Sequence, residues 1–241
     1  GGARAVNPFL RELNIARRFQ DPGILRIFRV GELHDGRFYQ AMELASGMSL
    51  EEEMRHRSLI PWREACEIAE ALSWSLAPLH EQGIVHRDVT PRNVIVRLGK
   101  DKRIHTKLID FGTAKLPGEW DDDLASPIGT PQYMSPEQAD GRGASLTSDV
   151  YGLGALLYEM LSGKSVLGLA RPTAENCCAY LRSGEAIPAN PLAACAPDIP
   201  EPIQALVARS LAYDPANRPN DAFAFGHELG DAFDASQDQE E

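Results

Sequence analysis

The sequence predicts an α+β fold in which a small β-rich part precedes a larger, mainly helical part. Two β-prone runs, residues 24–31 and 37–44, flank the turn-forming residues 34–36 and predict a hairpin. Two shorter runs, residues 94–96 and 104–109, flank a second turn-like segment and predict another hairpin. Most of the remaining chain carries apolar residues at helical spacing.

The helices follow from this spacing and from the residues that begin and end helices. Ser49 can cap the second helix, and Gly83 and Gly163 can end the third and the fourth. Residues 234–241 are expected to form a frayed acidic tail. The predicted helices span residues 7–20, 50–56, 61–82, 145–162, 172–182, 202–212 and 221–233.

Length and composition are those of an ordinary globular protein with a large core. The chain has 241 residues, of which 43% are hydrophobic and 24% are charged. This is enough for one long domain or two lobes. The formal charge of -11 at pH 7 disfavours a general binder of nucleic acid or of anionic membranes. A basic partner or substrate is easier to accommodate.

The cysteines show no metal-binding or disulfide pattern. They lack paired C-x-x-C spacing and a nearby histidine pattern, so we expect reduced thiols in a cytoplasmic protein. The sequence shows no signal peptide and no apolar run of about 18 residues or more, so no membrane segment is expected in this chain. The cysteines are Cys66, Cys177, Cys178 and Cys195.

The main functional signal lies in residues 84–93 and 108–112. They read Ile-Val-His-Arg-Asp-Val-Thr-Pro-Arg-Asn and Leu-Ile-Asp-Phe-Gly. Phosphoryl transfer needs a carboxylate that orients a hydroxyl nucleophile and two oxygen ligands that hold Mg²⁺ on a nucleotide's phosphates. The reason is that positioning and charge neutralisation dominate its catalysis. Asp88 can be this carboxylate, and Asn93 and Asp110 can be the ligands.

The second predicted hairpin supports this interpretation, because it begins next to Asn93 and ends next to Asp110 and would bring the two ligands together. Taken singly, each residue also has an ordinary explanation. Asp88 could be a turn former, Asn93 a strand-edge cap, and Asp110 an Asx turn before Gly112. The whole set, in the right order and separation, favours phosphoryl transfer.

From about residue 7 to about residue 233 the chain resembles the eukaryotic-type Ser/Thr protein kinases found in bacteria. The two segments above match the His-Arg-Asp-x-x-x-x-Asn and Asp-Phe-Gly motifs of that family. Residues 129–137, Gly-Thr-Pro-Gln-Tyr-Met-Ser-Pro-Glu, resemble the end of an activation segment. Residues 148–151 resemble the start of a buried helix, and residues 211–219 resemble a late arginine motif.

This resemblance implies a bilobal, protein-kinase-like fold with a truncated small β lobe and a large, mainly helical lobe. Residues 1–45 would be a partial N-terminal lobe with the hinge, residues 46–233 the C-terminal lobe, and residues 234–241 the tail. It also implies transfer of the γ-phosphate of ATP to protein hydroxyls, with ATP and Mg²⁺ as cofactors. The acidic charge of the chain suggests a basic protein substrate.

By the same resemblance, the catalytic residues are Asp88, Asn93 and Asp110, with Mg²⁺ held by Asn93 and Asp110. The nucleotide site would include the helix glutamate that pairs with the nucleotide-binding lysine, which is Glu12, and the gatekeeper, which is Met42. It would also include the hinge, residues 43–45, whose backbone meets adenine. These residues are Glu12, Met42, Glu43, Ala45 and Ile95.

Other residues have regulatory or structural roles in the family. Arg87 would receive a phosphate from the activation segment. Ser126 is the hydroxyl expected to carry it, and Thr130 is the alternative, although Thr130 also suits the shaping of the acceptor groove. The structural residues are His86 and Phe111, stacked with Ala16 and Ile27 between the lobes, Asp149, which holds the catalytic loop, and Arg218, which pairs with Glu137.

Two departures from the family pattern bear on activity. Thr90 stands where Ser/Thr kinases usually carry a lysine near the γ-phosphate, and a neutral hydroxyl cannot replace that charge. The sequence also has no G-x-G-x-x-G loop and no V-A-I-K-type strand, and its first lysine is Lys100. Gly152 and Gly154 lie within a predicted helix. The 241 residues alone are therefore expected to transfer phosphate only weakly. They are also expected to leave a sheet edge open to pairing with another chain.

Three functions remain open at this point. The first is an active Ser/Thr kinase whose first strands lie outside the sequence, and the second is a pseudokinase or docking module. The third is a small-molecule phosphotransferase of the aminoglycoside-kinase type. The activation-segment resemblance disfavours the third, because small-molecule kinases bind no protein chain there. The intact set of Asp88, Asn93 and Asp110 favours an enzyme, because a docking module has no physical need for two metal ligands.

Overall fold

The structure is a computed structural model that describes most of the chain from residue 15 to residue 237. Described are residues 15, 17–19, 21–57, 59–99, 101, 103–117, 129–169, 173–183, 192–193 and 195–237. The predicted first helix, residues 7–20, lies largely outside these ranges, as do Glu12, Ala16 and Ser126.

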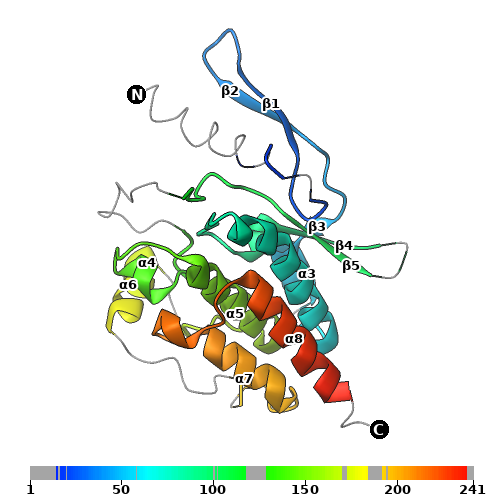
Figure 1. The fold of residues 1–241 in the computed structure, drawn as a ribbon, viewed down its shortest axis with the longest axis vertical. Coiled ribbons are helices and arrows are strands. Elements are labelled where there is room, and N and C mark those ends of the chain that lie inside the picture. The colour runs from blue at the N-terminus through cyan, green and yellow to red at the C-terminus, as the bar shows by residue number, and fades with distance from the viewer. Residues whose placement is uncertain are drawn as a thin grey trace.

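An antiparallel hairpin of β1 (Ile27–Glu32) and β2 (Phe38–Met42) forms the small β part. Its turn is held by Asp35, whose carboxylate accepts from the backbone N–H of Arg37 at 3.1 Å. Gly36 in the same turn has a φ of 82°, which glycine adopts without strain. The hairpin projects away from the helical part (Figure 1). Both strands agree with the prediction and are shorter than expected.

A three-stranded antiparallel sheet of order β3-β4-β5 lies between this hairpin and the helices. Its strands are β3 (Met48–Ser49), β4 (Val94–Leu98) and β5 (Ile104–Leu108). The predicted second hairpin is therefore confirmed as β4–β5. Gly47 precedes β3 with a φ of 125°, and a Cβ there would lie 2.2 Å from the carbonyl oxygen of Val96. Only glycine fits this approach to β4.

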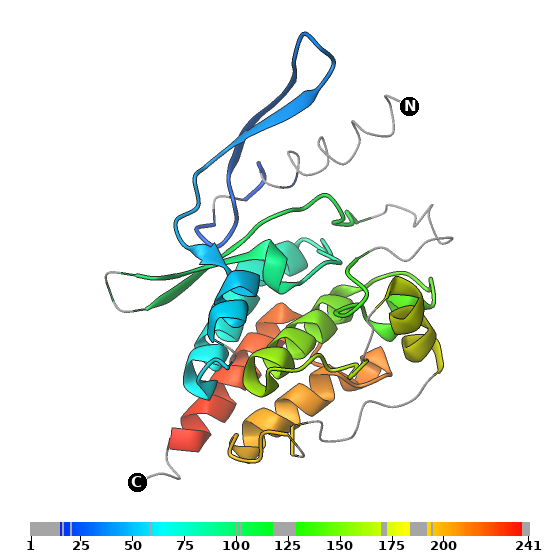
Figure 2. The same ribbon diagram turned by 180° about the vertical axis from the view of Figure 1, so that it is seen from behind.

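Helices make up most of the larger part. The longest is α3 (Trp62–Glu81), which packs against α5 (Leu146–Ser162) and α8 (Ala222–Gln237). α3 and α8 lie side by side in both views (Figures 1 and 2). The other elements are α2 (Leu50–Arg57), α4 (Pro136–Ala139), α6 (Ala174–Ser183), α7 (Glu201–Ser210) and the short 3₁₀ helices η1 (Pro91–Asn93) and η2 (Pro215–Asn217).

α5 lies in the core, and most of its residues are buried. A Cβ on Gly154 would lie 2.6 Å from Cβ of Ser210 in α7, and a Cβ on Gly152 would lie 3.0 Å from Cβ of Val89. These two glycines therefore serve helix packing, in agreement with their predicted place inside a helix. The helix ends at Gly163, which has a left-handed φ of 68°.

The segment before β1 attaches the small hairpin to the larger part. The N–H of Leu25 donates to the carbonyl of Leu108 at 3.0 Å, and the N–H of Leu108 donates to the carbonyl of Gly23 at 2.7 Å. A Cβ on Gly23 would lie 2.1 Å from Oγ of Ser75, so this segment also lies directly on α3. The attachment point on β5 is two residues before Asp110.

The last helix is longer than predicted. α8 continues to Gln237, beyond the expected end at Phe233. Ser236 is buried, and its hydroxyl donates to the carbonyl of Ala232 at 2.6 Å. The expectation of a frayed tail from residue 234 is wrong for these residues, because they continue the buried stripe of the helix.

Two tyrosine hydroxyls in the core differ in their hydrogen bonding. Tyr133 donates to a carboxylate oxygen of Glu159 at 2.5 Å. The hydroxyl of Tyr151 on α5 is fully buried and has no hydrogen-bond partner among the described residues. A buried donor without a partner is destabilising by about 1–3 kcal/mol, whereas a made hydrogen bond stabilises by about 1 kcal/mol.

We therefore expect Tyr151→Phe to leave the free energy of unfolding unchanged or to raise it. Tyr133→Phe serves as the matched control and is expected to lower it by about 1 kcal/mol, because Glu159 loses its donor. Urea denaturation of both variants measures the difference. An equal decrease in the free energy of unfolding of the two variants would show that the hydroxyl of Tyr151 has a hydrogen-bond partner.

Candidate active site

Asp149, near the start of α5, holds the backbone of the predicted catalytic loop, residues 84–93. Its carboxylate accepts from the N–H of His86 at 2.7 Å and from the N–H of Arg87 at 2.8 Å. His80 completes the arrangement, with Nε2 at 3.0 Å from the same carboxylate. Nδ1 of His80 accepts from the N–H of Ala222 at 2.9 Å, so Nε2 carries the proton and donates to Asp149.

Arg87 connects the catalytic loop to two other segments. Its Nε donates to the carbonyl of Thr113 at 2.5 Å, and its own carbonyl accepts from the side chain of Gln138 at 3.0 Å. The residue is buried and has a φ of 70°. Gly129, with a φ of 120°, passes so close that a Cβ there would lie 2.7 Å from the carbonyl oxygen of Arg87. Loop and activation segment are therefore packed backbone against backbone.

The carboxylate of Asp88 accepts one hydrogen bond on each oxygen. Oδ1 accepts from the backbone N–H of Thr130 at 2.7 Å, and Oδ2 accepts from Nδ2 of Asn93 at 2.8 Å. Nδ2 of Asn93 also donates to the carbonyl of Asp88 at 3.0 Å. Both partners of this amide group are oxygens, so its nitrogen must face Asp88. The amide oxygen of Asn93 therefore faces away from Asp88 and can accept a cation or a hydrogen-bond donor.

Asp110 lies beside Asn93 because the β4–β5 hairpin pairs their flanking residues. Val94 pairs with Leu108, and the N–H of Ile109 donates to the carbonyl of Asn93 at 2.9 Å. Asp110 is exposed and has a left-handed φ of 66°. Its carboxylate accepts from the N–H of Gly112 at 3.0 Å.

The donor set at this position suits a magnesium–nucleotide complex. Within the described residues, no three or more His, Cys, Asp and Glu side chains gather into a metal site. An all-protein cage is not needed for Mg²⁺, which is typically bound by one or two protein oxygens together with substrate phosphates and water. The amide oxygen of Asn93 and the exposed carboxylate of Asp110 offer such a pair.

His86 and Phe111 stack in the core beneath the site. Their ring centroids are 5.4 Å apart in an edge-to-face arrangement, and both side chains are fully buried. Burial lowers the pKa of His86 below its ordinary value, although the nearby Asp149 and Asp88 act in the opposite direction. The ring is therefore neutral, and its Nδ1 accepts from the N–H of Asp88 at 3.3 Å. Ile27 is also buried.

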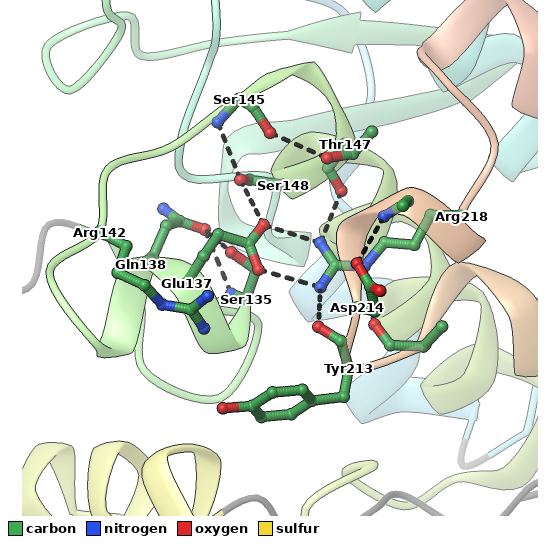
Figure 3. Close-up of polar contacts among 12 residues, drawn as sticks. Ser135, Glu137, Gln138, Arg142, Ser145, Thr147, Ser148, Tyr213, Asp214 and Arg218 are labelled. Atoms are coloured by element: carbon green, nitrogen blue, oxygen red, sulfur yellow. Dashed lines mark hydrogen bonds and ion pairs between the residues drawn. The ribbon is translucent and has the colours of Figure 1, made fainter.

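A buried ion pair joins the activation segment to the C-terminal part (Figure 3). Nη1 of Arg218 lies 2.7 Å from Oε1 of Glu137, and Nη2 lies 2.9 Å from Oε2. The hydroxyl of Ser148 donates to the same carboxylate at 2.7 Å. The remaining donors of the guanidinium bond to the carbonyls of Ala212, Thr147 and Tyr213.

The electrostatics of this pair favour the charged carboxylate. Burial alone would raise the pKa of Glu137, but the hydrogen bonds and charge of Arg218 and the hydroxyl of Ser148 lower it below the ordinary glutamate value. A two-pronged contact between guanidinium and carboxylate is also strongly directional. The Ser-Pro-Glu segment is thus fixed in both position and orientation.

Comparison with known proteins agrees with this arrangement. The protein kinase domain family matches residues 3–229. The chain belongs to this family. Its fold is therefore confirmed as that of a protein kinase, with a small antiparallel β part and a larger helical part.

Relatives of this kinase domain include several bacterial Ser/Thr kinases. The serine/threonine-protein kinase pkn3 of Myxococcus xanthus is 32% identical over 234 residues, which cover 94% of this chain and 42% of pkn3. PrkC of Bacillus subtilis is 30% identical, over 96% of this chain and 34% of PrkC. PknB of Mycolicibacterium smegmatis is 35% identical, over 87% of this chain and 33% of PknB. The kinase domain thus spans less than half the length of these relatives.

Glu43, in the predicted hinge, connects its segment to β5. Its carboxylate accepts from Nζ of Lys107 and from the N–H of Arg26, at 2.7 and 2.8 Å. Burial raises the pKa of Glu43, but these partners more than compensate, and the net shift is downward. Glu43, Ala45 and Ile95, three of the predicted nucleotide residues, line one groove of about 660 Å³. Met42 is not among the residues that line it and is 43% exposed.

Thr90, Thr130 and Ser126 of the kinase domain differ in exposure and contacts or lie outside the described residues. Thr90, at the position of the family's lysine, is buried with only 3% of its surface exposed. Thr130 contributes its backbone N–H to Asp88. Ser126, the predicted phosphate carrier, lies outside the described residues.

Sequence reasoning missed His80, Thr113 and Gln138. Gln138 had a recognisable signal, because Ser135 and Gln138 form an S-x-x-Q capping box at the start of α4, with Ser135 donating to Gln138 at 3.0 Å. His80 had no such sequence signal, because a single histidine on a long amphipathic helix belongs to no distinguishing motif. Thr113 acts through its carbonyl, which carries no side-chain signature.

Proposed function

We propose that this kinase domain transfers the γ-phosphate of ATP to serine or threonine hydroxyls of protein substrates. Asp88 is the catalytic base, and Asn93 and Asp110 hold Mg²⁺. The observation that supports this most directly is the fixed carboxylate of Asp88, which is held by Asn93 on one oxygen and by Thr130 on the other. This ties the base both to a metal ligand and to the segment that would bear the substrate.

The chemistry follows from these positions. Bound Mg²⁺ would neutralise the phosphate charge and orient the γ-phosphate. Asp88 accepts a hydrogen bond from the substrate hydroxyl on its remaining lone pairs and receives the proton as the oxygen attacks. Asn93 keeps its amide oxygen turned away from Asp88 through the two bonds of Nδ2. Positioning therefore comes from side chains that are fixed before the substrate arrives.

The activation segment favours a protein substrate over a small molecule. The ion pair of Glu137 and Arg218 holds the Ser-Pro-Glu segment. Thr130, which precedes this segment in the chain, donates its backbone N–H to Asp88. We further infer that Arg87 receives a phosphate from Ser126 and that Thr130 shapes the acceptor groove.

We infer a basic substrate from the net charge of -11 and a cytoplasmic kinase domain from the cysteine pattern. Within the described part of the chain, no helix is both long and apolar enough to cross a membrane. A partner chain could pair with the edge of the β1–β2 hairpin, whose two strands form a sheet of their own.

The test is transfer of labelled phosphate by the full-length protein. Purified protein is incubated with labelled ATP, Mg²⁺ and either a generic basic protein or an aminoglycoside, and the products are hydrolysed to identify phosphoamino acids. We expect phosphoserine or phosphothreonine that disappears in Asp88→Asn. Transfer to the aminoglycoside alone would make the chain a small-molecule phosphotransferase. Absence of any transfer would make it a docking module.

A further inference from the structure

The peptide group that joins Arg87 to Asp88 is held from both sides. Its N–H, on Asp88, donates to Nδ1 of His86 at 3.3 Å. Its carbonyl, on Arg87, accepts from Nε2 of Gln138 at 3.0 Å, and Arg87 and Gln138 are both buried. Since a peptide group is planar, these two bonds together fix its rotation. The orientation of this group in turn sets the direction in which the side chain of Asp88 leaves the backbone.

Arg87 needs this support because its backbone conformation is strained. Its φ of 70° is left-handed, a costly conformation for a residue other than glycine, and it persists only where surrounding contacts enforce it. Asp149 binds the N–H of Arg87 at 2.8 Å. Gln138 binds the carbonyl, so the two ends of the residue are fixed by different segments of the chain. Loss of Gln138 would release the carbonyl end, and with it the peptide group that leads into Asp88.

Gln138 is itself fixed by the start of α4. Its Oε1 accepts from the N–H and from the hydroxyl of Ser135, at 3.2 and 3.0 Å. The amide nitrogen therefore faces Arg87. Glu137, the preceding residue, is held by the guanidinium of Arg218 (Figure 3). The side chain of Gln138 thus connects the anchored Ser-Pro-Glu segment to the backbone of the predicted catalytic loop.

We propose that Gln138 is a positioning residue for Asp88 and acts on it through the carbonyl of Arg87. The inference rests on the proposed kinase function. In the reaction, the substrate hydroxyl oxygen bonds to the γ-phosphorus while the bond from that phosphorus to the β,γ-bridging oxygen breaks. The hydroxyl proton passes to Asp88, and ADP leaves with the electron pair. A displaced carboxylate lowers the rate of this step without lowering nucleotide affinity, because Asp88 contacts the hydroxyl and not the nucleotide.

The decisive comparison is between Gln138→Met and Gln204→Met in the full-length protein. Both glutamines are 7% exposed, and Nε2 of Gln204 donates to the carbonyl of Ile199 at 2.6 Å, so the two variants lose the same kind of bond. Gln138→Met should lower kcat by about 10²-fold and leave the dissociation constant of Mg-ADP within about threefold. Gln204→Met is the matched control and should leave kcat unchanged. Gln138→Asn, whose amide is one methylene too short to reach Arg87, is the second variant at this position and should lower kcat in the same way.

A second measurement does not depend on turnover. Arg87 and Asp88 form the only Arg-Asp step in the 241 residues, so ¹³C at arginine carbonyls and ¹⁵N at aspartate give this peptide group a cross-peak of its own. Gln138→Met should shift the ¹³C resonance and speed exchange of the amide proton by at least about tenfold, whereas Gln204→Met should change neither.

Two results would each overturn the proposal. One is an unchanged cross-peak in Gln138→Met, and the other is a kcat in Gln138→Met that equals that of Gln204→Met. A wild-type protein that transfers no phosphate would instead overturn the proposed function. The cross-peak would still show whether Gln138 holds the peptide group, so the two failures are distinguishable.

Discussion

Replacement of Asp88 by asparagine is expected to lower kcat for phosphoryl transfer by about 10³-fold while Mg-nucleotide binding stays within about tenfold. The carboxylate accepts from Thr130 on one oxygen and from Asn93 on the other. Asparagine offers only one acceptor oxygen, so one of these donors loses its partner and the base is lost. Nucleotide affinity persists because Asp110 and the amide oxygen of Asn93 remain.

The comparison variant is Asp110→Asn, which should weaken Mg-nucleotide binding by at least about tenfold, or ~1.4 kcal/mol. Calorimetric titration with Mg-ADP measures affinity, and a peptide assay measures turnover. Asp35→Asn, in the exposed turn of the β1–β2 hairpin, controls for loss of a negative charge and should change neither. Equal loss of nucleotide binding in Asp88→Asn and Asp110→Asn would contradict the division of roles between them.

Arg218→Ala is expected to lower the free energy of unfolding by about 3–5 kcal/mol, because it leaves Glu137 charged and buried without its partner. The guanidinium is fully buried, and its loss also frees the carbonyls that it binds. Chemical denaturation gives the value. The matched control is Arg142→Ala, which breaks the exposed pair of Arg142 and Asp140 beside the same segment and should cost less than about 1 kcal/mol.

If Arg218→Ala and Arg142→Ala were equally stable, the buried pair would contribute no more than an exposed one. The activation segment would then be held by the other contacts of α4. The Ser135–Gln138 capping box and the bond from Gln138 to the carbonyl of Arg87 are the candidates.

The ion pair of Glu137 and Arg218 is also expected to make the free energy of unfolding depend on pH. The pKa of Glu137 in the folded protein lies below its ordinary value of 4.5. The unfolded state therefore binds more protons between the two pKa values, and the stabilisation is complete above about pH 4.5 and is lost as the pH falls through the folded pKa. Denaturation midpoints measured from pH 7 downward should show this loss in the wild type and a smaller one in Glu137→Gln.

Much of the fold could be predicted from local patterns. Both hairpins and the long helices are encoded in apolar periodicity and in glycines such as Gly163, and these signals need no tertiary information. The end of α8 was missed because Asp234 is charged and resembles the start of an acidic tail. The buried stripe of the helix nevertheless continues past it, through Leu229, Ala232 and Ser236. The helix continues past Asp234 because the residues that follow keep the helical spacing of buried positions, although Asp234 itself is polar.

The candidate site could be predicted from the sequence only where its residues belong to a motif. Asp88, Asn93 and Asp110 stand out because they occupy the Asp and Asn positions of the His-Arg-Asp-x-x-x-x-Asn and Asp-Phe-Gly motifs. The contacts from the backbone N–H of Thr130 and from the carbonyls around Arg218 could not be predicted, because every residue has these groups and only the fold brings them together. The same holds for the attachment of Leu108 to residues 23 and 25.

The backbone at Arg87 and Asp110 limits how stable this protein can become. Among the described residues these are the non-glycine positions with positive φ, and such conformations are destabilising by about 1–3 kcal/mol each. Glycine would relieve the strain at either position, but it would also remove the guanidinium or the carboxylate. With the roles proposed for Arg87 and Asp110, selection for thermal stability and selection for catalysis would oppose each other at these two residues. Stabilising changes must accumulate elsewhere in the domain.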